Sequence, residues 1–81
     1  MMKENTRTIW DYIVAHDGED FTANDIAAAL GVSAKSVNGS VTSFQKKGHT
    51  VREEVAIPGG TVKYIRLTDA GRSFDPDQTE G

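Results

Sequence analysis

Polar side chains recur at helical spacing between residues 33 and 47. On a helix whose inner side is Val37, Val41 and Phe44, a step of about 100° per residue places lysines and small polar residues on the opposite face and its flanks. These residues are Lys35, Ser36, Asn38, Gly39, Thr42, Ser43 and Lys46. Lysine can bind phosphate or guanine, asparagine can pair with adenine through two hydrogen bonds, and glycine lets a helix approach a ligand closely. The set favours a nucleic-acid groove, although the same residue types also make an ordinary solvated helix face.

Residues that could support catalysis or bind a metal are few. The chain has no cysteine, and its two histidines are His16 and His49. No stretch matches the serine-centred elbow of hydrolases, the HExxH zinc motif or a phosphate-binding loop. The carboxylates after His16 are too close together in sequence for a tetrahedral metal site and lack the spacing of a calcium loop. We therefore expect a solvated acidic turn there, and neither enzyme activity nor a cofactor or metal.

Two short capped helices are needed to present the polar face. Thr22 is placed to accept a hydrogen bond from the backbone N–H three residues on, and the first helix ends at Gly31. Its apolar side is predicted to consist of Ile26, Ala29 and Leu30. Ser33 caps the second helix, which ends in two lysines and a glycine at residues 46–48. Together they form a helix-turn-helix, which must pack against other elements because both apolar faces are narrow.

The flanking segments supply those elements. From about Thr6 to His16 the periodicity predicts an amphipathic helix with Trp10 in the core. Its apolar positions are Ile9, Trp10, Ile13 and Val14. After residue 48 the period changes to two, and a turn at residues 58–60 separates two strand-like runs. Because an isolated hairpin is marginal in water, we expect its apolar side, Val51, Val55 and Ile57, to pack on the helices.

Three basic residues lie on the predicted hairpin, namely Arg52, Lys63 and Arg66. Basic side chains on such a hairpin can follow a phosphate backbone, and Lys63 is the preferred candidate beside the uncharged turn. Glu53 and Glu54 oppose such contact, and they could instead pair with Arg52 or Lys63 across the strands.

The net charge of −3 hides an uneven distribution. Residues 1–30 carry two basic and six acidic side chains, and residues 31–74 carry seven basic and three acidic ones. Residues 75–81 carry three acidic side chains. A net charge of +4 between residues 31 and 74 is compatible with phosphate binding despite the acidic total.

The length of 81 residues allows one domain. We expect it to cover residues 1–74 and to close with a short helix that Thr68 caps and that carries Phe74. Residues 75–81 are polar and acidic, which predicts a disordered tail. No apolar run approaches the roughly 18 residues that cross a bilayer, and no signal peptide is recognisable. The expectation is a cytoplasmic protein without a membrane partner.

The order helix, helix, helix, hairpin, short helix resembles that of the winged helix-turn-helix domain. The sequence motifs are most similar to those of MarR-like bacterial and phage regulators. DIAAALGVS at residues 25–33 resembles the family's "ELA..LGVS". SVNGSVTSFQKKG at residues 36–48 resembles "TV...L..L.KKG", and IRLTDAGR at residues 65–72 resembles "..LT..GR". The implied fold class is α+β, a winged helix-turn-helix of three helices plus a two-stranded antiparallel β-hairpin wing. One departure follows the Lys-Gly pair at residues 47–48. The family usually has a large apolar residue directly after this pair, whereas this chain has His49 and Thr50 before Val51, which predicts an extra residue or a polar start to the wing.

The resemblance implies binding of double-stranded DNA and regulation of transcription, with helix 33–47 in the major groove and the wing, residues 50–67, on the backbone. Full-length family members carry added helices that form a dimer, for which these 81 residues leave no room. Since one such module buries only about 600–1,000 Å² on DNA, useful specificity would need a homodimer or paired sites. The alternative is an adaptor that binds a transcription or other regulatory protein, which the acidic first helix and tail favour.

Overall fold

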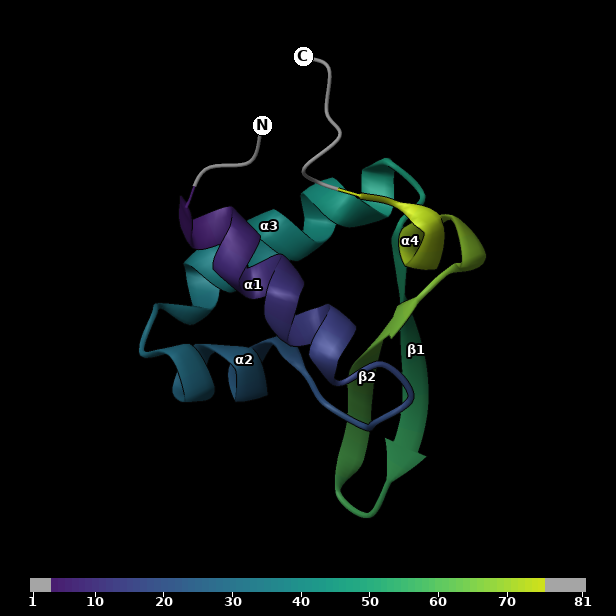
Figure 1. The fold of residues 1–81 in the computed structure, drawn as a ribbon. Helices are drawn as coiled ribbons and strands as arrows, with labels where there is room; N and C mark the ends of the chain where they lie inside the picture. The colour runs from purple at the N-terminus through teal and green to yellow at the C-terminus, as the bar shows by residue number, and fades with distance from the viewer. Residues whose placement is uncertain (1–3, 76–81) are drawn as a thin grey trace.

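The computed structural model of the chain describes residues 4–75. Residues 1–3 and 76–81, which include most of the predicted acidic tail, lie outside the described part. The elements are α1 (Glu4–Ala15), α2 (Ala23–Leu30), α3 (Ala34–Lys46), β1 (Thr50–Ile57), β2 (Gly60–Leu67) and α4 (Asp69–Ser73). The three longer helices pack together, and the β1–β2 hairpin projects away from them (Figure 1). The predicted fold class and order of elements are confirmed.

Local capping fixes the ends of α2 and the start of α3. The Thr22 hydroxyl accepts from the Asp25 N–H at 3.2 Å, and the Asp25 carboxylate accepts from the Thr22 N–H at 2.9 Å. Gly31 ends α2 in a left-handed conformation with φ of 71°, which glycine adopts without steric cost. Ser33 accepts from the Ser36 N–H at 3.1 Å and starts α3. The turn between the two helices is therefore set by local chemistry, as the sequence predicted.

The core joins α1, α2 and α3 to the base of the hairpin. Trp10 is 2% exposed and meets Phe44 edge-on, with ring centroids 5.0 Å apart. Two predicted core positions are wrong. Val14 is 46% exposed because the core side of α1 is centred on Ile9, Trp10 and Ile13. Ala29 is exposed because the inner face of α2 is formed by Ala23, Ile26, Ala27 and Leu30, and Ala29 lies to one side of it.

The hairpin packs through the opposite face from the one predicted. The antiparallel register pairs Thr50 with Leu67 and Arg52 with Ile65, and this face lies toward the helices. Val51 and Ile57 are each 45% exposed. A period of two shows which residues share a face but not which face is inward, and the buried β2 residues decide it here.

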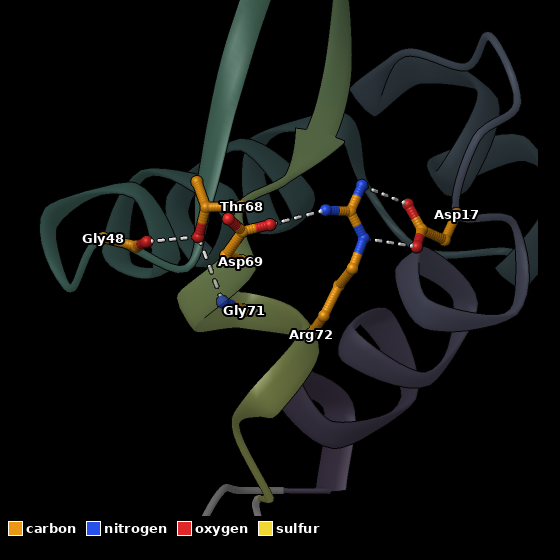
Figure 2. A network of polar contacts seen from close by, with 6 residues as sticks. All are labelled: Asp17, Gly48, Thr68, Asp69, Gly71 and Arg72. Atoms are coloured by element: carbon orange, nitrogen blue, oxygen red, sulfur yellow. Dashed lines mark hydrogen bonds and ion pairs between the residues drawn. The ribbon is translucent and has the colours of Figure 1, made fainter.

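A backbone hydrogen bond and a short helix hold the hairpin in place. The Ile65 N–H donates to the Phe21 carbonyl at 2.9 Å, which ties β2 to the segment before α2. The Thr68 hydroxyl accepts from the Gly71 N–H at 3.0 Å and donates to the Gly48 carbonyl at 2.6 Å (Figure 2). Thr68 therefore caps α4 as predicted and joins it to the end of α3.

The start of the wing is polar in residue type but is packed into the protein. Thr50 is fully buried, and the His49 ring stacks on Phe74 with centroids 4.3 Å apart. The aromatic contacts of His49 occupy the place where the resemblance leads one to expect a large apolar residue.

Candidate nucleic-acid interface

The outer face of α3 carries the predicted site residues as a continuous exposed surface. Val37 and Val41 are fully buried and Phe44 is 1% exposed, so the opposite side of the helix is free. The seven predicted α3 residues are all exposed, namely Lys35, Ser36, Asn38, Gly39, Thr42, Ser43 and Lys46. The periodicity of the apolar stripe thus predicted correctly which α3 residues face outward.

One side of this face is tied to the wing through Arg52. The Arg52 guanidinium donates to the Gln45 Oε1 at 3.1 Å and to the Asn38 Oδ1 at 3.3 Å. The Asn38 Nδ2 in turn donates to the Ala34 carbonyl at 3.0 Å. Both ends of the Asn38 amide are therefore engaged within the protein in this conformation. This link could not be predicted from local sequence, because Asn38 and Arg52 are 14 positions apart along the chain.

Arg66 is taken up by acidic partners. It donates to Glu53 at 2.8 Å and to Asp20 at 2.7 Å, and also to the Glu19 carbonyl at 2.8 Å. The carboxylates of Asp20 and then Glu53 raise the pKa of Arg66 further above its usual range. Glu53 therefore pairs across the strands with Arg66, and not with Arg52 or Lys63, the two partners considered from the sequence.

The acidic turn after α1 is exposed, as predicted, and two of its carboxylates also bind arginines from later in the chain. Asp17 accepts from Arg72 at 2.9 Å, and this guanidinium also reaches Asp69 at 3.2 Å (Figure 2). Hydrogen bonding from Arg72 lowers the pKa of Asp17. His16 contacts Glu19 at 2.9 Å. No group of residues within the described range 4–75 could hold a metal ion.

Lysines supply the positive charge that remains available. Lys35, Lys46, Lys47 and Lys63 have no ion-pair partner among residues 4–75. Arg52 is bonded only to neutral amide oxygens. Uncompensated cations therefore gather on α3, at its C-terminal end and on the wing.

A polar cleft of about 360 Å³ lies between the start of α2, the flank of α3 and the hairpin. We call it the wing cleft. Its lining residues are Thr22, Ala23, Asn24, Asn38, Arg52, Thr61, Val62 and Lys63. The cleft brings Lys63 and Asn38 together from separate elements, as the predicted interface requires.

The elements define a winged helix-turn-helix domain: α2 and α3 form the helix-turn-helix, and the antiparallel hairpin lies beside the exposed face of α3. The chain has the winged-helix fold of the MarR-like transcription regulators, since such regulators are among the solved structures that it matches. No protein-family model matches the chain, and no curated protein matches it.

Three solved structures illustrate the likeness. MepR, a transcription regulator of the Staphylococcus aureus multidrug efflux pump MepA, is 26% identical with a TM-score of 0.75, over 89% of this chain and 51% of MepR. The S. aureus MepR–DNA complex matches with a TM-score of 0.73 at 26% identity, over 89% of this chain and 50% of that one. A MarR-like regulator from Thermotoga maritima is 24% identical with a TM-score of 0.70, over 89% of this chain and 49% of that one, which shows the fold alone. The chain spans about half the length of these proteins.

No helix among residues 4–75 is long and apolar enough to cross a membrane.

Proposed function

We propose that this chain binds double-stranded DNA and regulates transcription, with α3 in the major groove and the wing on the adjacent backbone. The observation that carries the proposal is the exposed face of α3, on which Lys35 and Lys46 have no acidic partner among residues 4–75. The two lysines are three helical turns apart, so their span of roughly 16 Å matches a groove about 12 Å wide crossed at an angle. The likeness to MepR, which has been solved with DNA, supports the same conclusion.

The proposed contacts divide by chemistry. Lys35 and Lys46 would bind phosphate or guanine, and Thr42 and Gly39 lie between them on the same face. Ser36 and Ser43 flank this line and suit phosphate or base-edge contacts. Lys63 on β2 would contact the backbone, and Asn38 would read a base only after releasing Arg52. The wing and α3 would thus act on one stretch of duplex.

Salt titration of duplex binding tests the proposal. The affinity for a random duplex should fall as salt rises, with a slope of about −0.9 for each phosphate neutralised. Lys35→Gln and Lys46→Gln should each weaken binding and reduce the slope by about one. Lys3→Gln is the charge-matched control because Lys3 precedes α1. Absence of binding at low salt, or binding that ignores both salt and the α3 lysines, would overturn the proposal.

The exposed wing face favours the adaptor as a second candidate. Val51 and Ile57 point away from the helices, and a protein partner could cover them. A reporter gene that the protein regulates can separate the two candidates, because each predicts that regulation depends on a different surface of the protein. Regulation that survives Lys35→Glu with Lys46→Glu but is lost in Val51→Thr with Ile57→Thr would support the adaptor. The reverse pattern supports DNA binding.

A further inference from the structure

His49 lies where four elements of the fold meet. Its N–H donates to the Phe44 carbonyl of α3 at 2.9 Å, and its carbonyl accepts from the Thr68 N–H, directly after β2, at 3.1 Å. Its ring stacks on Phe74, which follows α4, and meets Trp10 of α1 edge-on at 5.9 Å. We call these five residues the wing joint, because β1 begins here, directly after the end of α3.

The wing joint is closely packed, yet it contains polar atoms without partners. Thr50 is fully buried, and its hydroxyl has no hydrogen-bond partner among residues 4–75. The Nδ1 of His49 is also buried without a partner in that range, although the whole side chain is only half-buried. A methyl group at Gly71 would clash with the His49 carbonyl oxygen, so the backbone has no spare space on the side of α4. The joint therefore holds a neutral imidazole but offers no acceptor for a second ring proton.

Protonation of His49 would place a charged N–H at this buried position. In a neutral imidazole one nitrogen donates and the other accepts, whereas both nitrogens donate once the ring is charged. A buried charged donor without an acceptor costs more free energy than a neighbouring aromatic ring returns through its attraction for a cation. Acid therefore favours a form in which the ring leaves Phe74 and Trp10 and reaches water. Because the His49 backbone is bonded to both Phe44 and Thr68, freeing the residue loosens the attachment of the wing to α3.

The charges around the wing joint do not offset this cost. No carboxylate among residues 4–75 accepts a hydrogen bond from the Nδ1 of His49. Burial, and then the positive charge of Lys47, lower the pKa of this ring. The charged residues within three positions of the contacts of His49, in that part of the chain, are Arg7, Asp11, Lys46, Lys47, Arg66, Asp69, Arg72 and Asp75.

We propose that the wing joint is a pH-sensitive switch, in which protonation of His49 frees its ring from Phe74 and Trp10 and releases the wing from the end of α3. Neutral His49 holds the wing beside α3, which is the arrangement that duplex binding requires. The effect of the switch on binding rests on the proposed function, but the release of the wing does not. Acid should therefore weaken duplex binding. A charge effect alone predicts the opposite, because a new cation close to Lys47 would attract phosphate.

Amide hydrogen exchange in the full chain, followed by NMR, tests the release without DNA. An opening that frees a ring with the usual pKa of 6.5 becomes up to about tenfold more frequent between about pH 7.5 and 5.5. We expect this loss of protection, corrected for the intrinsic exchange rate, at the His49 and Thr68 amides. It should depend little on added urea, because the opening is local. The Gly31 amide at the end of α2 is the internal control, and its protection should not change with pH.

Two variants assign the effect to one of the two histidines. His49→Phe keeps an aromatic ring in the joint and should remove the pH dependence at Thr68. His16→Gln removes the other titrating ring, which contacts Glu19, and should behave as the parent protein does.

Three results would overturn the release of the wing. Protection at Thr68 could be equal at both pH values. It could instead fall with the same urea dependence as protection of the Val37 amide, which would mean that the whole fold opens. If His49→Phe does not fold, the ring signals of His49 in the parent protein still decide the question, because titration of the ring without loss of protection at Thr68 would contradict the release.

Duplex affinity at about pH 7.5 and 5.5, at equal ionic strength, tests the consequence for binding. Affinity should fall by up to about tenfold more in the parent protein than in His49→Phe, because linkage sets the same limit. His16→Gln should follow the parent. Affinity that rises in acid through His49 would be a charge effect, and lost protection with unchanged affinity would be release without regulation. Either result would overturn the switch. Absence of duplex binding at both pH values would count against the proposed function, while exchange at Thr68 would still decide the release.

Discussion

Gly39 and Gly71 are both helical glycines, but a methyl group would meet different surroundings at the two positions. A Cβ at Gly39 finds no atom within 4 Å, whereas one at Gly71 would clash with the His49 carbonyl oxygen. Gly71→Ala should therefore lower the free energy of unfolding by about 1–3 kcal/mol, the range for overpacking a filled space. Gly39→Ala should raise it by about 0.5–1 kcal/mol, because alanine favours an exposed helix interior. Urea denaturation of the two variants measures both effects.

Gly39→Ala also tests how closely α3 approaches DNA. A methyl group on the outer face of α3 would hold the helix away from the groove. We expect weaker duplex binding from a more stable protein, measured by fluorescence anisotropy at fixed salt. Unchanged affinity would place Gly39 outside the contact surface, and its absent side chain would then have no role in binding.

His49 makes the stability of the fold depend on pH. Its Nδ1 is buried without a hydrogen-bond partner among the described residues, and its ring meets Trp10 edge-on at 5.9 Å. Burial, with a smaller contribution from the charge of Lys47, lowers the pKa of His49 from its usual 6.5. The folded protein then binds fewer protons than the unfolded chain. Stability should therefore be full above pH 6.5 and fall as the pH drops toward the folded-state pKa.

His49→Phe keeps an aromatic ring in this place and removes its titration. The free energy of unfolding should then change less between about pH 7.5 and 5 than it does in the parent protein. Asp17 does not interfere, because Arg72 lowers its pKa from a usual value of 3.8, below this window. Urea titrations of both proteins at several pH values make the comparison. Equal slopes would assign the pH dependence to other groups.

Among the elements, the wing and α3 are linked by one side chain. Arg52→Lys keeps the charge, but an ammonium cannot span both Gln45 and Asn38 as the planar guanidinium does. We expect a loss of about 0.5–1.5 kcal/mol in unfolding free energy and faster amide exchange in β1 and β2. Lys63→Arg, an equally conservative change on the wing, is the control. If the amides of β1 and β2 exchanged as slowly in Arg52→Lys as in the parent protein, Arg52 would not hold the wing and α3 together.

Helix ends were predictable from the sequence because they depend on neighbours three or four residues apart. Thr22 and Ser33 cap the helices that they were expected to cap, and Gly31 ends α2. The exposed face of α3 was predictable for the same reason, since one apolar stripe determines the opposite side. The orientation of the hairpin was not predictable in this way, because both of its faces carry apolar residues. Its inward face depends on packing against helices far away in sequence.

The details of the candidate site were predictable only in part. Exposure of Lys35 and Lys46 followed from the helical period, but their freedom from acidic partners depends on tertiary structure. The sequence offered Arg66 and Arg52 as equivalent wing cations. In the structure Arg66 is held by Asp20 and Glu53, whereas Arg52 meets only neutral oxygens. Which arginine keeps its charge available depends on contacts that span up to 47 residues.

For the whole molecule, ion pairs leave the available positive charge on Arg52 and on the lysines of α3 and the wing. Asp17 and Asp20, on the turn between α1 and α2, bind Arg72 and Arg66 at 2.9 and 2.7 Å. These contacts tie the acidic N-terminal part to the later, basic part and neutralise two of its arginines, Arg66 and Arg72, but not Arg52. The lysines of α3 and the wing are left to set the field that a duplex would meet under the proposed function. A chain with a net charge of −3 can thereby present a cationic face.

Under the proposed function, a chain that reads DNA with α3 alone should bind a duplex weakly, and joining two copies should strengthen binding. One module buries about 600–1,000 Å² on DNA, so the chain should bind a random duplex with a Kd of about 10⁻⁴–10⁻⁶ M at physiological salt. Two copies joined by a flexible linker should bind about 10²–10⁴-fold tighter if both reading helices reach major grooves about 34–36 Å apart. A tandem whose second copy carries Lys35→Gln and Lys46→Gln should return to single-module affinity. If the tandem and the single chain bound with equal affinity, the two α3 faces could not contact one duplex together. Pairing would then not be the way in which this chain increases its affinity for DNA.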